Sequence, residues 1–96
     1  MQVEGVYTVQ NLGRHRIVSE LADGSELQSN KLAYLVLDDG SQVRLGARPD
    51  DELALEGQKV VASGSKVADW PPPGDPRAAQ VNAKPTLLQI TSVKPV

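Results

Sequence analysis

Hydrophobic and polar residues alternate along most of the chain with a period of two, which is typical of β-strands. In the first such segment Val3, Tyr7 and Val9 fall on one face of an extended chain. Glycine and proline interrupt the pattern about every ten residues, as they do between the short strands of a sandwich or barrel. The pattern predicts an all-β fold. Strands are predicted at residues 3–9, 14–21, 31–37, 42–46, 58–67 and 86–93.

Within these predictions, Gly64 is a place where the strand 58–67 can bulge or curl, and Leu88 and Ile90 are expected to face inward from the last strand. The long segment 3–21 carries Gly13 near its middle. We expect it to form two strands, with one bulged strand as the alternative.

An Asp-Gly-Ser sequence occurs twice, at residues 23–25 and 39–41. An Asp-Gly pair between two strand-like segments favours a type I′ hairpin turn, because glycine readily adopts a positive φ. We therefore expect a type I′ turn at 38–41 and a tight turn at the start of a polar loop, 22–30. The recurrence indicates repeated turn chemistry, since the flanking residues differ.

Two segments depart from the strand pattern. Residues 49–56 predict one short helix, with Pro49 and acidic residues in its first turn and Gly57 at its end. Residues 68–85 contain five of the seven prolines and predict a long, partly extended loop.

This order of elements resembles that of small bacterial oligonucleotide/oligosaccharide-binding (OB) domains. The resemblance covers most of residues 14–93 and rests on segments 34–40, 57–64 and 87–93. It implies a five- to six-stranded barrel whose short helix, at about 49–56, lies between the third and fourth core strands. Another small barrel, such as an SH3-like one, and a β-sandwich fragment are the competing folds.

The chain has 96 residues, enough for a single domain spanning 1–96 and too few for a multidomain enzyme. Aromatic residues make up only 3%, so the core must consist of aliphatic side chains.

The net charge of −2 argues against duplex nucleic acid or a membrane as partner. The absence of cysteine excludes disulfides and thiolate chemistry. The first residues lack a basic start and an apolar run, so we expect a cytoplasmic protein, although a trimmed secreted or periplasmic one would look the same.

Residues suited to catalysis are scarce. His15 is the one histidine, and Arg14 and Arg16 beside it would repel a metal cation. The acidic residues at 38–39 and 50–52 are explained by a turn and by a helix dipole. We therefore expect no enzyme activity, no cofactor and no metal.

The leading hypothesis is a non-enzymatic binding or assembly module. It would dock a protein partner, or a second copy of itself, through loop 68–85 and an open strand edge. The alternative is a single-stranded oligonucleotide-binding domain. Arg14 and Arg16 are expected on one strand face, and Tyr34 and Arg44 on the outer face of two neighbouring strands, where OB folds bind ligands. Trp70 either covers the barrel end or anchors a partner. The candidate binding residues are Arg14, Arg16, Tyr34, Arg44, Trp70 and Arg77.

Overall fold

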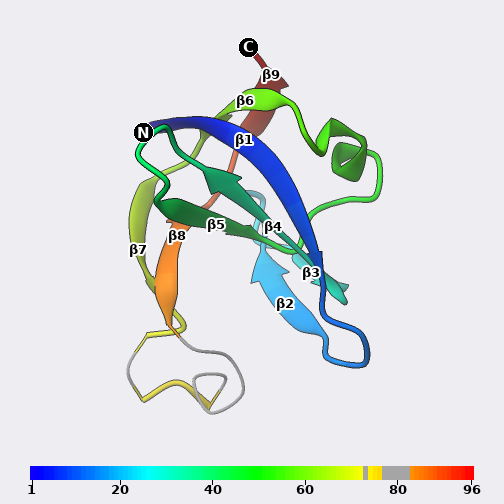
Figure 1. Ribbon diagram of the computed structural model, residues 1–96. Helices are drawn as coiled ribbons and strands as arrows, with labels where there is room; N and C mark the ends of the chain where they lie inside the picture. Colours follow the sequence, from blue (N-terminus) through cyan, green and yellow to red (C-terminus); the bar gives the residue numbers. More distant parts are fainter. Residues whose placement is uncertain (73, 77–82) are drawn as a thin grey trace.

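The computed structural model describes residues 1–72, 74–76 and 83–96, and it confirms the all-β prediction (Figure 1). The described residues form nine strands and one turn of 3₁₀ helix. Residues 3–21 divide into two strands, as expected. The elements are β1 Gln2–Asn11, β2 Ile17–Glu20, β3 Glu26–Ser29, β4 Lys31–Val36, β5 Gln42–Gly46, η1 Glu52–Leu55, β6 Lys59–Ser63, β7 Lys66–Trp70, β8 Lys84–Leu88 and β9 Ser92–Pro95.

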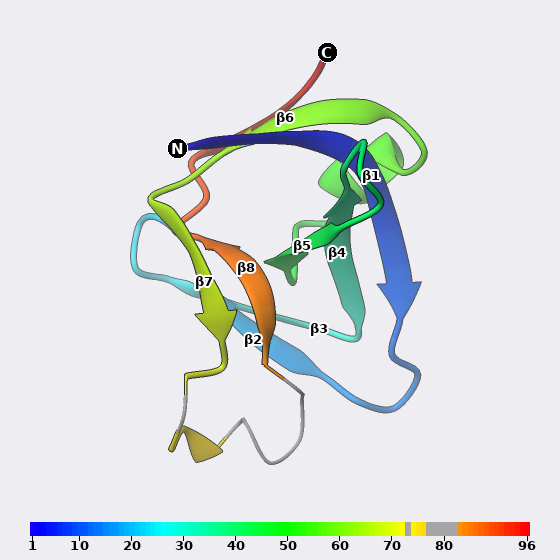
Figure 2. The same ribbon diagram turned by 60° about the vertical axis from the view of Figure 1, so that its left-hand side comes forward.

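Seven strands form one curved sheet in the order β7-β8-β5-β4-β1-β6-β9, and β2 and β3 form a separate two-stranded sheet (Figures 1 and 2). Neighbours are antiparallel except β5 and β8, which are parallel. The predicted closed barrel of five or six strands is wrong, because the sheet stays open with β7 and β9 at its edges. The number of strands is higher than predicted because the strands predicted at 58–67 and 86–93 are each divided into two. In addition, β3 lies inside the predicted loop 22–30.

Both broken strands belong to one long, bent antiparallel ribbon. Its halves are the β6–β9 and β7–β8 ladders, and the register shifts by one residue between them: Ser63 and Lys66 are three residues apart, whereas their partners Ser92 and Leu88 are four apart. A Cβ on Gly64 would lie 2.6 Å from the Leu88 carbonyl oxygen, so only glycine fits at the bend. The bend predicted at Gly64 is therefore confirmed.

The single strand predicted at 86–93 is wrong, because the chain leaves the extended conformation at Gln89, where φ is 50°. This break changes which side chains face inward. Leu87 and Ile90 are buried, whereas Leu88 is only half-buried.

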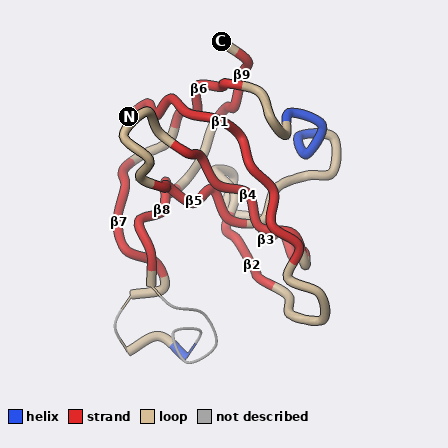
Figure 3. The backbone as a smooth tube through the Cα atoms, viewed as in Figure 1, coloured by secondary structure: helices blue, strands red, loops and turns tan. Residues whose placement is uncertain are grey.

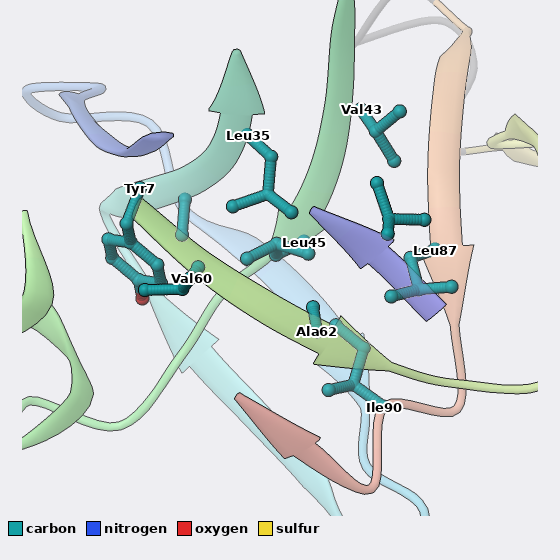
Figure 4. Close-up of a cluster of buried hydrophobic side chains, with 10 residues drawn as sticks. Tyr7, Leu35, Val43, Leu45, Val60, Ala62, Leu87 and Ile90 are labelled. Atoms are coloured by element: carbon teal, nitrogen blue, oxygen red, sulfur yellow. The ribbon is translucent and has the colours of Figure 1, made fainter. Parts of the chain in front are cut away.

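Strand alternation separates a buried face from an outer face. Tyr7, Leu35 and Val43 are paired across β1, β4 and β5 and point into the core (Figure 4). Tyr34 and Arg44, one residue along, are paired on the opposite face. As the composition predicts, the core is aliphatic apart from Tyr7. Its buried residues are Val3, Tyr7, Ala33, Leu35, Val43, Leu45, Val60, Ala62, Leu87 and Ile90.

The predicted helix at 49–56 is wrong; η1 is a single 3₁₀ turn. The C-terminal end of the segment is held by β1, because the Gly57 N–H donates to the Tyr7 carbonyl and the Tyr7 N–H donates to the Gln58 carbonyl. The helical turn therefore ends before Glu56, whose ψ of 132° is not helical. The Tyr7 hydroxyl donates to Glu52 Oε1 (3.2 Å), and Arg48 donates to both carboxylate oxygens of Glu52 (2.8 and 3.0 Å). Burial and the neighbouring carboxylate raise the pKa of Tyr7.

The two Asp-Gly-Ser sequences form the same turn. In one, the Gly40 N–H donates to the Leu37 carbonyl, and Asp39 Oδ1 accepts from the backbone N–H and the hydroxyl of Ser41 (2.9 and 2.6 Å). The other repeats these bonds with Leu21, Asp23, Gly24 and Ser25. The predicted type I′ turn at 38–41 is wrong, because that turn needs a positive φ at both central residues and φ is positive at Gly40 but not at Asp39. Hydrogen bonds from the serines lower the pKa of both aspartates.

Replacing Tyr7 by Phe is expected to lower the free energy of unfolding by about 1–2 kcal/mol, because the change removes a hydrogen bond to a carboxylate. Urea denaturation at neutral pH measures the loss. Tyr34→Phe is the control, since the described residues offer its hydroxyl no partner, and its effect should stay within about 0.5 kcal/mol. Equal losses in the two variants would contradict the assigned role of the Tyr7 hydroxyl.

Ser41→Ala is expected to raise the pKa of Asp39 toward its ordinary value of about 3.9, with Asp23 unchanged as an internal control. A depressed carboxyl pKa stabilises the fold above the unfolded-state pKa, and this contribution is lost as pH falls through the folded-state pKa. The variant should therefore be less stable than the wild type near neutral pH, and the difference should shrink in acid. NMR titration of both carboxyls and denaturation at several pH values measure these effects. An unchanged Asp39 pKa would refute the assignment.

Candidate ligand-binding groove

A groove of about 780 Å³ is lined by the β2–β3 hairpin on one side and by β5, β7 and β8 on the other. Apolar side chains from both the hairpin and the sheet line part of it, including Ile17, Val18, Leu45 and Leu87. Polar side chains share the lining. The described cationic residues among them are Arg16, Arg44, Arg48, Lys66 and Lys84.

Arg44 occupies the centre of this surface. It is paired with Tyr34 on β4 and with Thr86 on β8, so these residues form a row across three strands on the face away from the core. Arg44 is half-buried, and this burial lowers the pKa of its guanidinium. A second hollow of about 190 Å³ is lined by Tyr34, Arg44 and Lys84. Since Arg44 and Lys84 line both, the two hollows adjoin.

The groove keeps an excess of positive charge although the whole chain carries −2. Arg48 is neutralised by its bidentate ion pair with Glu52. Arg16, Lys66 and Lys84 are exposed, and no carboxylate of the described residues forms an ion pair with them. Of the described lining residues, only Glu20 is acidic. An anionic ligand would therefore meet several cations and one carboxylate.

The hairpin wall is fixed to the sheet at one specific point. The Ala47 N–H donates to Ser19 Oγ on β2 (2.8 Å). Beside it, Gly46 has a φ of 74°, and a Cβ there would lie 3.3 Å from the Ser19 Cβ and clash with its hydroxyl. Only glycine lets the hairpin approach this closely.

The structure brings together four of the six predicted site residues. Arg16, Arg44 and Trp70 line the groove, and Tyr34 lines the adjoining hollow. Trp70 is the last residue of β7 and is half-buried. The loop predicted at 68–85 is thus shorter, because β7 and β8 occupy both of its ends. Arg77 lies outside the described residues.

The prediction that Arg14 and Arg16 share a strand face is wrong. A turn occupies residues 12–15: the Asn11 side chain accepts from the Gly13 N–H, and the His15 N–H donates to the Leu12 carbonyl. The strand therefore begins only at Ile17. Arg14 does not line the groove, whereas Arg16 does.

Sequence reasoning missed Lys66 and Lys84. The signal available was a lysine at the start of each strand that flanks the proline-rich segment. Their relation to Arg44 depends on the parallel pairing of β5 with β8, which joins residues far apart in the chain. No local pattern indicates such a pairing.

Within the described part of the chain, no group of three or more His, Cys, Asp or Glu side chains is placed to hold a metal ion. The same residues include no helix with the length and apolar character needed to cross a membrane. Comparison of the chain with protein-family models, curated proteins and solved structures finds no match. Functional inference therefore rests on the groove itself.

Proposed function

We propose that the chain is a non-enzymatic binding module that holds a single-stranded oligonucleotide in the groove. The observation that carries this proposal is the convergence of four cations, contributed by separate parts of the chain, with one carboxylate among the described lining residues. These cations are Arg16, Arg44, Lys66 and Lys84. Proteins that bind single strands combine a cationic groove with aromatic rings on which bases stack.

Tyr34 and Trp70 supply the aromatic rings. Tyr34 lies beside Arg44 on the neighbouring strand, and Trp70 lies at the end of β7, where β7 pairs with Lys84 of β8. Each ring thus adjoins a cation that can contact phosphate. Stacking of a base on such a ring contributes about 1–3 kcal/mol. With a net charge of −2, the protein offers little long-range attraction, so we expect moderate affinity and strong dependence on salt.

The strand arrangement supports the same proposal. With β6 and β7 counted as one bent strand, and β8 and β9 as another, the main sheet comprises five strands: β1, β4, β5, β6–β7 and β8–β9. The 3₁₀ turn then lies between the third and fourth. In OB folds, which are partly open five-stranded barrels, ligands contact the second and third strands and the connections between strands one and two and between four and five. Here the first of these connections is the segment that carries the β2–β3 hairpin, and β7 and β8 flank the second. We therefore propose an OB-like fold with an open sheet.

The protein is expected to bind fluorescent single-stranded DNA or RNA at low salt, with a change in the emission of Trp70. Lys84→Gln should weaken binding and reduce the slope of log K against log salt by about 0.7, the effect of one lost phosphate contact on a single strand. Lys94→Gln is the matched control, because Lys94 lies on β9 and does not line the groove. Absence of binding at low ionic strength would refute the proposal, and equal effects of the two variants would refute the site.

A second candidate function, docking of a partner protein or a second copy, is favoured by the open sheet. β7 and β9 each have one hydrogen-bonded neighbour in the sheet and are edge strands. An edge strand can pair with a strand of another chain. The β7 edge leads directly into the proline-rich segment.

Self-association through these edges is expected to appear as a rise in apparent mass with concentration. Light scattering over a wide concentration range measures it, with a high-salt arm to remove charge effects. A constant monomeric mass at all concentrations would exclude a second copy as the partner.

A further inference from the structure

The β2–β3 hairpin forms a two-stranded sheet of its own, distinct from the seven-stranded main sheet (Figure 3). At its base, the Leu12 N–H donates to the Asn30 carbonyl (2.7 Å), and Asn30 Nδ2 donates to the Gly13 carbonyl (3.1 Å). An isolated two-stranded hairpin is only marginally stable in water. Its position therefore depends on its contact with the main sheet, which β2 makes chiefly with β5.

That contact is specific. Ala47 is completely buried, and its N–H has Ser19 Oγ as acceptor. If the hairpin left this position, the N–H would need water or another acceptor, since an unpaired buried donor costs about 1–3 kcal/mol. The missing side chain of Gly46 makes the space into which Ser19 fits. Ser19, Gly46 and Ala47 together are called the seat below.

The seat also determines the shape of the groove. Arg16, Ile17 and Val18 come immediately before Ser19 and line the groove, as do Ser19, Glu20 and Gln28 of the same hairpin. Lys66, Lys84 and Trp70 line the groove from the sheet. When the hairpin is seated, Arg16 therefore shares one groove with the two lysines. When it is not, the groove loses a wall that carries one cation, Arg16, and one carboxylate, Glu20.

Resting on the proposed function, we infer that the hairpin is a hinged arm that closes over a bound oligonucleotide, and that Ser19 and Gly46 are positioning residues that hold it closed. Both residues line the groove, so a readout taken without ligand is needed to separate positioning of the hairpin from direct ligand contact. Their effect is transmitted through Arg16, which the closed arm brings to the phosphates. The population of the seated arm then limits the apparent affinity, because only the closed form offers the complete groove.

A comparison of Gly46→Ala with Gly40→Ala isolates the effect of the seat on the position of the hairpin. Both glycines lie on the β4–β5 hairpin with positive φ, 74° and 85°, so both variants introduce similar backbone strain. A Cβ at Gly40 has open space, whereas one at Gly46 meets Ser19. Gly46 also lines the groove whereas Gly40 does not, so a difference between the two variants is assigned to the hairpin only when it appears without ligand. Trp70 is the single tryptophan and lines the groove, so its quenching by acrylamide reports on the arm without any nucleic acid.

We expect Gly46→Ala to increase the quenching of Trp70 relative to Gly40→Ala. We also expect it to weaken binding of fluorescent single-stranded DNA about tenfold if the seated fraction falls to about one tenth. The slope of log K against log salt should fall by about 0.7 as the Arg16 contact is lost, a change that strain alone would not produce. Equal quenching in the two glycine variants would overturn the inference, as would increased quenching with unchanged affinity.

Ser19→Ala is a second variant that tests the same contact if Gly46→Ala does not fold. It removes the hydroxyl that accepts from Ala47 without adding bulk, and it should change quenching and affinity in the same direction. Unchanged quenching in Ser19→Ala would overturn the role of Ser19. A wild-type protein that binds no oligonucleotide would overturn the proposed function and closure over the ligand together. Quenching would still decide whether Gly46 seats the hairpin.

Discussion

The close approach of Gly64 to the Leu88 carbonyl is the contact on which the rest of the architecture depends. It lets the ribbon formed by residues 59–70 and 84–95 bend, so that one half pairs with β1 and the other half continues the sheet beside β5. Because of this bend, β8 lies next to Arg44 on β5, with β7 on the far side of β8. The shape of the groove is therefore a consequence of a packing constraint some distance from it.

The same strand alternation that builds the core also builds the outer surface. On β1, β4 and β5, Tyr7, Leu35 and Val43 point into the core. The next residue on β4 and on β5, Tyr34 and Arg44, lies on the outer face. With few aromatic residues, the core relies on aliphatic packing and on Tyr7, whose hydroxyl ties η1 to β1. Thus the most buried aromatic ring stabilises the fold, while Tyr34 and Trp70 remain partly exposed.

The features that sequence reasoning predicted are local. Alternation identified β1, β4 and β5 and placed Tyr34 beside Arg44, because a period of two follows directly from strand geometry. The failures involve competition with distant contacts. The helix at 49–56 was cut short where residues 57–58 and Tyr7 exchange backbone hydrogen bonds, and the last strand was broken at Gln89. The parallel pairing of β5 with β8, which completes the groove, joins segments that no short pattern relates.

The hairpin carries its own Asp-Gly-Ser turn, with the same hydrogen bonds as the turn that joins β4 to β5. Its tip is thus folded by local bonds, and its side chains contribute none of the buried core cluster. Substitutions or insertions at the tip can accumulate during evolution at little cost to the main sheet. Residues 21–27 do not line the groove, so such changes would also leave the groove lining unaltered.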